Sequence, residues 1–250
     1  MDKRYWNRRA RDYDEEVLNS IKSDRRGVIA RRLRQYAQAS KIATDFGCGA
    51  GKYVPALAAR FDRVYAIDFA AKLLESAREH CTGIGNVRFL QGDLAKGKFP
   101  IRKAHFGVCQ NVLISPERGQ AKAILRNVSR HIVRGGHLMV LVPSTESALY
   151  CSQRHVEWNR REGKRGKALT EDVEVPRRAL DLIEGVFERE GVPTKHYLRE
   201  EAESLLGAEG FELRSMDKVE YGWDSEFAQP PRWLGDPHPW DWMMVAQKAA

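Results

Sequence analysis

The chain has 250 residues, of which 42% are hydrophobic and 30% charged, so we predict one globular domain whose core needs neither disulfides nor metal. Its four cysteines include no C-x-x-C pair, which argues against a zinc site and for a reducing compartment. No stretch approaches the roughly 20 apolar residues of a membrane span, and we expect a cytoplasmic protein without membrane contact.

The net charge of +8 is distributed unevenly along the chain. Residues 1–150 are basic overall, whereas residues 151–250 are acidic. A basic half raises the possibility of nucleic acid or an anionic substrate as a partner. Acidic residues are interleaved among the basic ones and no block of five like charges occurs, so the pattern favours a solvated surface.

The first predicted element is a helix over residues 14–38, where apolar residues fall near helical spacing among charges. From residue 40 the period changes to short apolar runs, which are KIATDF, RVYAID, NVRFLQGD, HFGVCQNVLI and HLMVLVPS. Helical patterns over residues 70–81 and 124–133 separate some of these runs. Strands that alternate with helices in this way predict a parallel sheet with crossover helices.

After Pro143 the alternation stops. Residues 144–197 contain a basic, polar stretch and then a predicted amphipathic helix, whose apolar side is Ala179, Leu182, Ile183, Val186 and Phe187. A helix over residues 198–206 and two strand candidates, FELRSMDKVEYGW and WDWMMVAQK, complete the chain. The segment between those strands is too rich in proline for regular structure. We interpret residues 144–197 as an insertion between elements of one sheet.

The most informative segment is ATDFGCGAGKYV, in which the first strand turns into a helix. Bare backbone amides in such a turn let a ligand approach closely. A G-x-G-x-x-G dinucleotide fingerprint fails because position 52 is Lys52. A phosphate-binding P-loop fails because Phe46 and Tyr53 stand where glycine and Ser or Thr are needed.

Two acidic residues follow this turn at informative positions. Asp68 ends the second strand candidate, where a carboxylate can accept hydrogen bonds from two ribose hydroxyls. Asp93 follows the third strand candidate, where a polar side chain can meet the edge of an adenine. Together with the D-x-G-x-G-x-G pattern of residues 45–51 and with Gly135 and Gly136, this order resembles the class I S-adenosylmethionine-dependent methyltransferases.

The resemblance covers residues 40–143 well and residues 194–250 fairly. It implies an α/β, Rossmann-like doubly wound fold with a mostly parallel seven-stranded sheet, helices on both faces and an antiparallel last strand. It also implies one methyltransferase domain with four parts. These are an N-terminal helical cover (1–40), a cofactor-binding core (41–143), an insertion that covers the substrate (144–197) and a C-terminal helix and strand pair (198–250).

By the same resemblance, the expected cofactor is S-adenosylmethionine. Asp45 supports the turn and the ligand's amino group, residues 47–51 line the methionine part, Asp68 holds the ribose, Asp93 flanks the adenine and Asn111 faces the sulfonium. The full implied set is Tyr13, Asp45, Gly47, Cys48, Gly49, Gly51, Asp68, Phe69, Asp93, Leu94 and Asn111. The aromatic residues near the N-terminus that could close over the ligand are Tyr5, Trp6 and Tyr13.

The methyl acceptor is less defined by the sequence. The chain reads CQNVLI at the fourth strand, without N-P-P-Y or D-P-P-Y, so the exocyclic amino group of adenine is not the expected acceptor. No cysteine follows a proline, which argues against methylation of pyrimidine C5. Ring-nitrogen or ribose methylation of RNA stays open. The short N-terminal segment and the insertion resemble small-molecule methyltransferases, and we therefore expect a small-molecule acceptor and a monomer or homodimer.

Methyl transfer from a sulfonium is a direct displacement, and a base is needed only for a hydroxyl or a protonated nitrogen. The candidate bases in the covering segments are His155, Glu157, His196 and Tyr197, of which His196 and Tyr197 rank first. Two alternatives remain. One is an RNA or protein methyltransferase that uses the basic residues of the insertion, and the other is a non-catalytic, S-adenosylmethionine-binding regulatory module.

Overall fold

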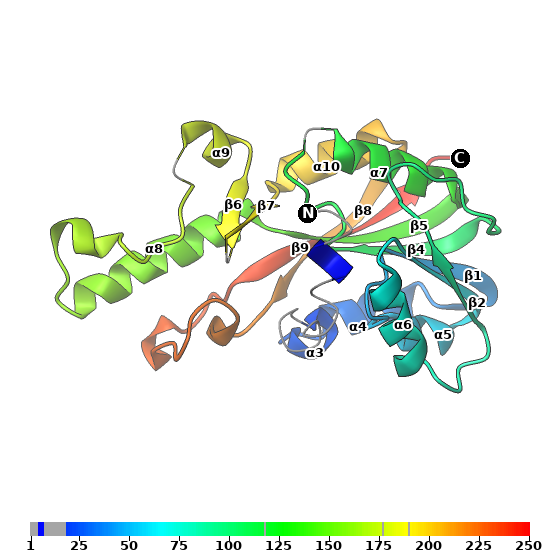
Figure 1. The fold of residues 1–250 in the computed structure, drawn as a ribbon, viewed down its shortest axis with the longest axis horizontal. Coiled ribbons are helices and arrows are strands. Elements are labelled where there is room, and N and C mark those ends of the chain that lie inside the picture. The colour runs from blue at the N-terminus through cyan, green and yellow to red at the C-terminus, as the bar shows by residue number, and fades with distance from the viewer. Residues whose placement is uncertain (1–4, 8–18, 118, 177, 190) are drawn as a thin grey trace.

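The computed structural model describes residues 5–7, 19–117, 119–176, 178–189 and 191–250. Its centre is a seven-stranded sheet with the order β3-β2-β1-β4-β5-β9-β8 (Figure 1). The strands are β1 (Gln38–Phe46), β2 (Phe61–Asp68), β3 (Val87–Gln91), β4 (Ala104–Gln110), β5 (Ile132–Pro143), β8 (Phe211–Glu220) and β9 (Trp240–Lys248). Strands β1 to β5 pair in parallel, and β9 is antiparallel to both β5 and β8. The expected doubly wound, mostly parallel sheet with an antiparallel last strand is therefore confirmed.

Helices cover both faces of the sheet (Figure 1). One face carries α4 (Val28–Gln35), α5 (Val54–Ala58) and α6 (Ala71–His80), and the other carries α7 (Gln120–Arg130) and α10 (Arg199–Ala208). The short helix α3 (Ser20–Ser23) precedes α4. None of the helices in the described part of the chain has the length and apolarity needed to cross a bilayer.

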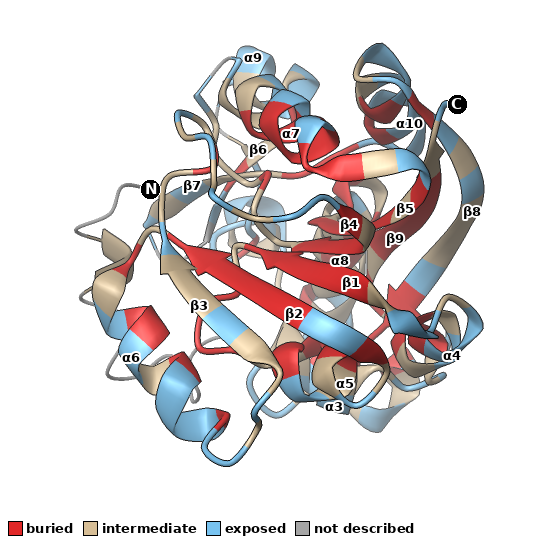
Figure 2. Cartoon of the chain, turned by 90° about the vertical axis from the view of Figure 1, so that its right-hand side faces the viewer, coloured by how far each residue is buried: buried red, intermediate tan, exposed pale blue. Residues whose placement is uncertain are grey.

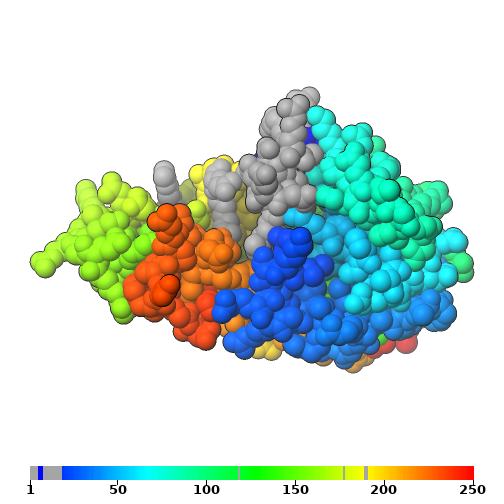
Figure 3. Space-filling view, turned by 90° about the horizontal axis from the view of Figure 1, so that it is seen from below, coloured from blue at the N-terminus to red at the C-terminus, as the bar shows by residue number. Residues whose placement is uncertain are grey.

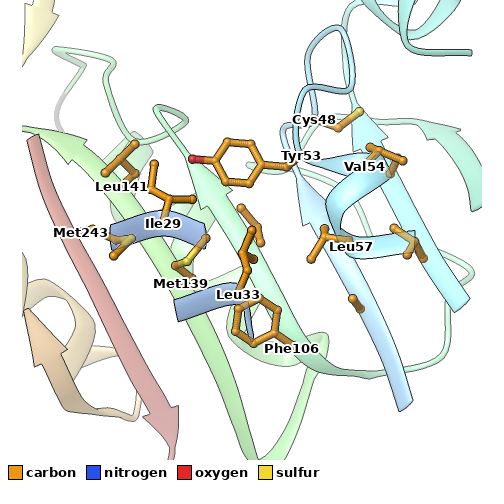
Figure 4. Close-up of a cluster of buried hydrophobic side chains, with 14 of the residues drawn as sticks. Ile29, Leu33, Cys48, Tyr53, Val54, Leu57, Phe106, Met139, Leu141 and Met243 are labelled. Atoms are coloured by element: carbon orange, nitrogen blue, oxygen red, sulfur yellow. The ribbon is translucent and has the colours of Figure 1, made fainter. Parts of the chain in front are cut away.

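The central strands are buried on both faces, as their unbroken apolar runs predict (Figure 2). Figure 4 shows Ile29 and Leu33 of α4 pointing onto the sheet toward Phe106 and Met139. Each fully buried aliphatic side chain contributes roughly 1.5–3 kcal/mol to folding. Because the strands are held by this packing, the carboxyl ends of the strands fix the positions at which the following loops begin.

The helix predicted over residues 14–38 is wrong in its extent, because the described part of it contains two helices. Residues 14–18 lie outside the described residues. Helix α3 ends before Gly27, whose φ of +61° belongs to the left-handed region that favours glycine. The Asp24 carboxylate accepts a hydrogen bond from the Ile29 amide at 2.7 Å and caps the start of α4.

The insertion contains a long helix, α8 (Thr145–Arg161), a 3-10 turn η1 (Gly166–Leu169), a short helix α9 (Ala179–Ile183) and a hairpin. The predicted amphipathic helix is wrong from residue 185 onward, since β6 (Val186–Arg189) pairs with β7 (Val192–Lys195). Gly185 has φ +65°, and a Cβ there would stand 2.4 Å from the His196 carbonyl oxygen. The backbone therefore turns at Gly185, and Ile183 remains 77% exposed instead of packing on a core.

Helix α8 projects away from the sheet and is supported by the loop between β8 and β9, residues 221–239 (Figures 1 and 3). The guanidinium of Arg161 lies 3.8 Å from the centre of the Trp233 ring, and that of Arg154 lies 5.0 Å from it. The loop contains two 3-10 turns, η2 (Trp223–Ser225) and η3 (Arg232–Leu234). The stretch expected to lack regular structure is thus ordered by cation–π contacts and buried aromatic rings.

Candidate active site

A cavity opens at the carboxyl ends of β1, β2, β3 and β4, where ligands bind in open α/β sheets. The sequence-predicted residues in its wall are Asp45, Gly47, Cys48, Gly49, Asp68, Phe69, Asp93, Leu94 and Asn111. Residues that the sequence did not single out as ligand contacts also line it, and these are Lys52, Tyr53, Leu73, Gly92, Gln110, Val112, Ile114, Ser115, Gln120 and Ile124. Four of the second group, Lys52, Gly92, Gln110 and Val112, adjoin predicted residues, so proximity in sequence was the available signal for these four; the other six had no such signal.

The glycine turn is held by the neighbouring strand. The amides of Gly47 and Cys48 both donate to the Ile67 carbonyl oxygen, at 2.7 and 3.0 Å. Gly47 has φ +80°, and a Cβ there would lie 2.3 Å from Cγ2 of Val112. Gly51 lies outside the cavity wall and against α6, where a Cβ would stand 3.1 Å from that of Ala77. The turn therefore needs glycine at both positions, at Gly47 beside the cavity and at Gly51 for helix packing.

Asp68 connects the end of β2 to the glycine turn. Its carboxylate accepts hydrogen bonds from the amides of Gly49 and Ala70, each at 2.9 Å. Burial raises the pKa of Asp68, and these backbone hydrogen bonds oppose that rise. The contacts fix the carboxylate in the cavity wall, where its remaining lone pairs can accept hydrogen bonds from a ligand.

Asp45 lies at the end of β1 and is only 2% exposed. Burial, and secondly the charge of Asp68, raise the pKa of Asp45 to about 8. Two carboxyl groups in one apolar turn favour a ligand that brings positive charge or hydrogen-bond donors.

Two carboxamide oxygens in the cavity wall are buried and have no hydrogen-bond partner among the described residues. They are Oδ1 of Asn111 and Oε1 of Gln120. Asn111 also has φ +49°, which is uncommon for a residue other than glycine. A buried acceptor without a partner destabilises the folded protein. Both oxygens therefore indicate that this cavity binds a ligand with N–H or O–H groups.

The chain was compared with models of known protein families. A family model described as "Methyltransferase domain" matches residues 43–136, which span β1 to the start of β5 and include most of the cavity wall. This match identifies residues 43–136 as a methyltransferase domain. No curated protein matches the chain.

Solved structures extend the likeness of fold to the rest of the chain. An S-adenosylmethionine-dependent methyltransferase from Methanosarcina mazei is 20% identical, with a TM-score of 0.63 over 87% of this chain and 97% of that one. DhpI in complex with S-adenosylhomocysteine is 19% identical, with a TM-score of 0.63 over 99% and 95%. Magnesium protoporphyrin IX methyltransferase from Synechocystis, with S-adenosylmethionine bound, is 16% identical, with a TM-score of 0.54 over 89% and 76%.

The chemistry of the cavity wall fits S-adenosylmethionine as a ligand. The ligand offers an ammonium group, two ribose hydroxyls and an exocyclic amine, and the wall offers the carboxyl groups of Asp45 and Asp68 and the free oxygens of Asn111 and Gln120. Among the described residues, no group of three or more His, Cys, Asp or Glu side chains is placed to hold a metal ion.

The N-terminal segment reaches the cofactor cavity at two points. Trp6 lines the cavity, whereas Tyr13 lies outside the described residues. Ser20 of α3 is buried, accepts a hydrogen bond from Nε2 of Gln110 at 2.7 Å and lies 3.0 Å from the Tyr53 hydroxyl. Sequence reasoning missed this contact because Ser20 and Gln110 are 90 residues apart.

None of the four candidate bases lines the cofactor cavity, and Glu157 pairs with Arg154 and Arg161 along α8. His155 and His196 line a second cavity, which α8, residues 172–174, β6 and the β8–β9 loop enclose. Burial lowers the pKa of His155. Tyr197 is buried, and its hydroxyl donates to the Leu113 carbonyl oxygen at 2.6 Å. The structure thus brings the two histidines together but does not place them beside the predicted cofactor residues.

Proposed function

We propose that this methyltransferase transfers a methyl group to a small molecule by direct in-line displacement. The observation that carries the proposal is the enclosure of the cavity beyond Asn111. Trp6 lines the cavity from the N-terminal side. Ile114, also in the wall, accepts a hydrogen bond from the Lys195 amide at 2.9 Å, and Leu113 accepts one from Tyr197. Walls from the N-terminal segment and from loops held by the insertion suit a compact acceptor better than a polymer.

The charge pattern of the insertion supports the same proposal. Arg161 pairs with Glu157 at 2.7 Å and stacks on the Trp233 ring, and Lys164 pairs with Asp172 at 3.3 Å. Cations that are already paired within the fold have less to offer the phosphates of RNA. Among proteins of similar fold, magnesium protoporphyrin IX methyltransferase is named for a small-molecule substrate.

When bound, S-adenosylmethionine supplies the methyl group on a sulfonium. We propose that Asp68 accepts hydrogen bonds from the ribose, that Asp45 takes the ammonium group and that Asn111 faces the sulfonium. The glycine turn holds this end of the ligand against the backbone, and the surrounding apolar walls exclude water. Alignment of two reactants in such a pocket can supply roughly 7–11 kcal/mol of the barrier reduction.

The candidate bases take other roles in this proposal. The Tyr197 hydroxyl is already used to hold Leu113, and burial raises the pKa of Tyr197, so it does not release its proton near neutral pH. We propose that Tyr197 is a positioning residue for the loop between β4 and α7. His155 and His196 belong to the second cavity. Alignment is therefore the main source of rate, as a neutral amine or carboxylate acceptor would allow.

A screen with radiolabelled S-adenosylmethionine tests the proposal. A pool of cell metabolites should give labelled product, whereas total RNA and denatured cell protein should not. Asp68→Ala is the control for donor-dependent turnover. Labelled RNA, or the absence of turnover with any pool, would contradict a small-molecule enzyme and favour one of the two alternatives.

A charge-reversal variant separates the RNA alternative further. Changing Arg160, Arg161, Lys164 and Arg165 to glutamate should leave donor binding intact if these residues form a solvated surface. An RNA enzyme should show a steep salt dependence in the parent chain and lose RNA affinity in the variant. RNA binding that depends on these four charges would overturn the proposal.

A further inference from the structure

One face of α7 connects the cofactor cavity to the turn that follows β3. Gln120, Ile124 and Asn127 are spaced at i, i+4 and i+7, so they lie on one side of the helix. Asn127 donates from Nδ2 to the Leu94 carbonyl oxygen at 3.0 Å and also to that of Gly97. Ile124 packs in the same buried cluster as Leu94. This face of α7 therefore lies on residues 93–97, at the end of the cavity where the adenine is expected.

Asp93, the expected partner of the adenine, also makes contacts within its own turn. Its Oδ1 accepts a hydrogen bond from the Ala95 amide at 2.8 Å, and its Oδ2 lies 3.7 Å from the Lys96 ammonium. The Asp93 side chain is also 42% exposed, so water competes for it. Asp93 therefore stabilises the turn, and any hydrogen bond that it accepts from a ligand competes with water.

Gln120 differs from Asp93 in each of these respects. It lines the cavity at the first turn of α7, and its Oε1 is buried without a hydrogen-bond partner among the described residues. A buried amide oxygen left without a donor destabilises the folded chain, and a ligand N–H removes that cost. Of the cofactor's parts, the adenine offers such a donor at this end of the cavity, through its exocyclic amine.

We propose that Gln120 recognises the exocyclic amine of the cofactor's adenine and so determines the specificity for adenine over other purines. The proposal rests on S-adenosylmethionine as the cofactor and adds a residue to its recognition. In this arrangement Asp93 stabilises the turn, and Leu94 and Ile124 make apolar contacts to the adenine. Gln120 accepts a hydrogen bond from the exocyclic amine of the adenine. A buried hydrogen bond of this kind discriminates strongly, because a purine without the amine leaves Oε1 unpaired.

The test is a double-mutant cycle between protein and ligand, measured by calorimetry. The ligands are S-adenosylhomocysteine and its 6-deamino analogue, in which hydrogen replaces the amine. The wild-type chain should bind the analogue five- to fifty-fold more weakly. Gln120→Leu should lose a similar factor for S-adenosylhomocysteine, yet bind both ligands within about twofold of each other. Ser115→Ala is the matched control, because the Ser115 hydroxyl accepts from the Glu117 amide in its own loop, and it should keep the wild-type ratio.

The outcomes separate Gln120 from its alternatives. A ratio that stays at the wild-type value in Gln120→Leu would overturn the proposal, as would a loss of affinity that is equal for both ligands. If Asp93→Ala abolishes the difference in affinity between the two ligands while Gln120→Leu keeps it, Asp93 and not Gln120 binds the amine, and the proposal is overturned. A wild-type chain that binds neither ligand would instead contradict the cofactor assignment, and the proposal with it.

Discussion

Replacing Asp45 with asparagine tests whether the ligand-free protein holds a buried carboxyl group that resists ionisation. The side chain is 2% exposed, and burial, followed by the charge of Asp68, raises the pKa of Asp45 from its ordinary 3.8 to about 8. Between these two values the folded chain keeps a proton that the unfolded chain has released. The free energy of unfolding therefore falls as the pH rises from about 4 to about 8, and asparagine removes this dependence.

The magnitude follows from the pKa difference. Each increase of one pH unit between these two pKa values lowers the free energy of unfolding by about 1.4 kcal/mol. Between pH 6 and pH 8 the wild-type chain should therefore lose about 2–3 kcal/mol relative to Asp45→Asn. The other titratable residues are common to both proteins, so their contributions cancel in the difference.

Urea denaturation at pH 6, 7 and 8 measures this difference directly. Calorimetry with S-adenosylhomocysteine on the same two proteins should show that Asp45→Asn binds at least tenfold more weakly, because the variant lacks the carboxylate that we propose as the partner of the ligand's amino group. Parallel pH profiles for the two proteins would refute the argument that a buried carboxyl group at Asp45 titrates near neutrality. Unchanged ligand affinity would refute its role in the site.

Three further substitutions test the geometry of the site. Gly47→Ala should destabilise the chain by roughly 1–2 kcal/mol in urea denaturation and weaken S-adenosylhomocysteine binding at least tenfold, since φ is +80° and the new Cβ meets Val112; binding at wild-type affinity would contradict this. Asp68→Ala should weaken binding by ~1.5–3 kcal/mol in calorimetry, and an unchanged affinity would remove Asp68 from the ribose site. Tyr197→Phe should cost about 1–2 kcal/mol of stability, because the Leu113 carbonyl oxygen loses its donor; an unchanged urea midpoint would argue against that role.

The sequence was sufficient for the fold class and for nine of the residues that line the cavity. The alternation of apolar runs with helical patterns predicts the parallel strands, because the period of hydrophobic residues is a local property of the chain. The glycine turn at residues 45–51, Asp68 and Asp93 each follow a strand, and parallel strands bring their carboxyl ends to one edge. The ends of consecutive strands therefore form one site, and the sequence shows its residues in the order in which the strands occur.

The sequence was insufficient for segments whose conformation depends on distant contacts. The apolar pattern at residues 179–187 suits a helix, yet the chain forms α9 and then the β6–β7 hairpin, since Gly185 packs against the backbone of His196. His155 and His196 both looked like candidate bases, and their common position in a second cavity depends on how α8 lies against the hairpin. No local pattern carries that information.

Tertiary structure also decided which polar side chains around the cavity have hydrogen-bond partners within the protein. Sequence alone could not show that Ser20 contacts Gln110, that Asp93 is used within its own turn or that Oε1 of Gln120 is buried without a partner. Hydrophobic periodicity determines which elements form, because burial repeats along the chain with the period of the element. The state of a single hydrogen-bonding group depends instead on which atoms from remote segments reach it, and packing of the complete chain determines those atoms.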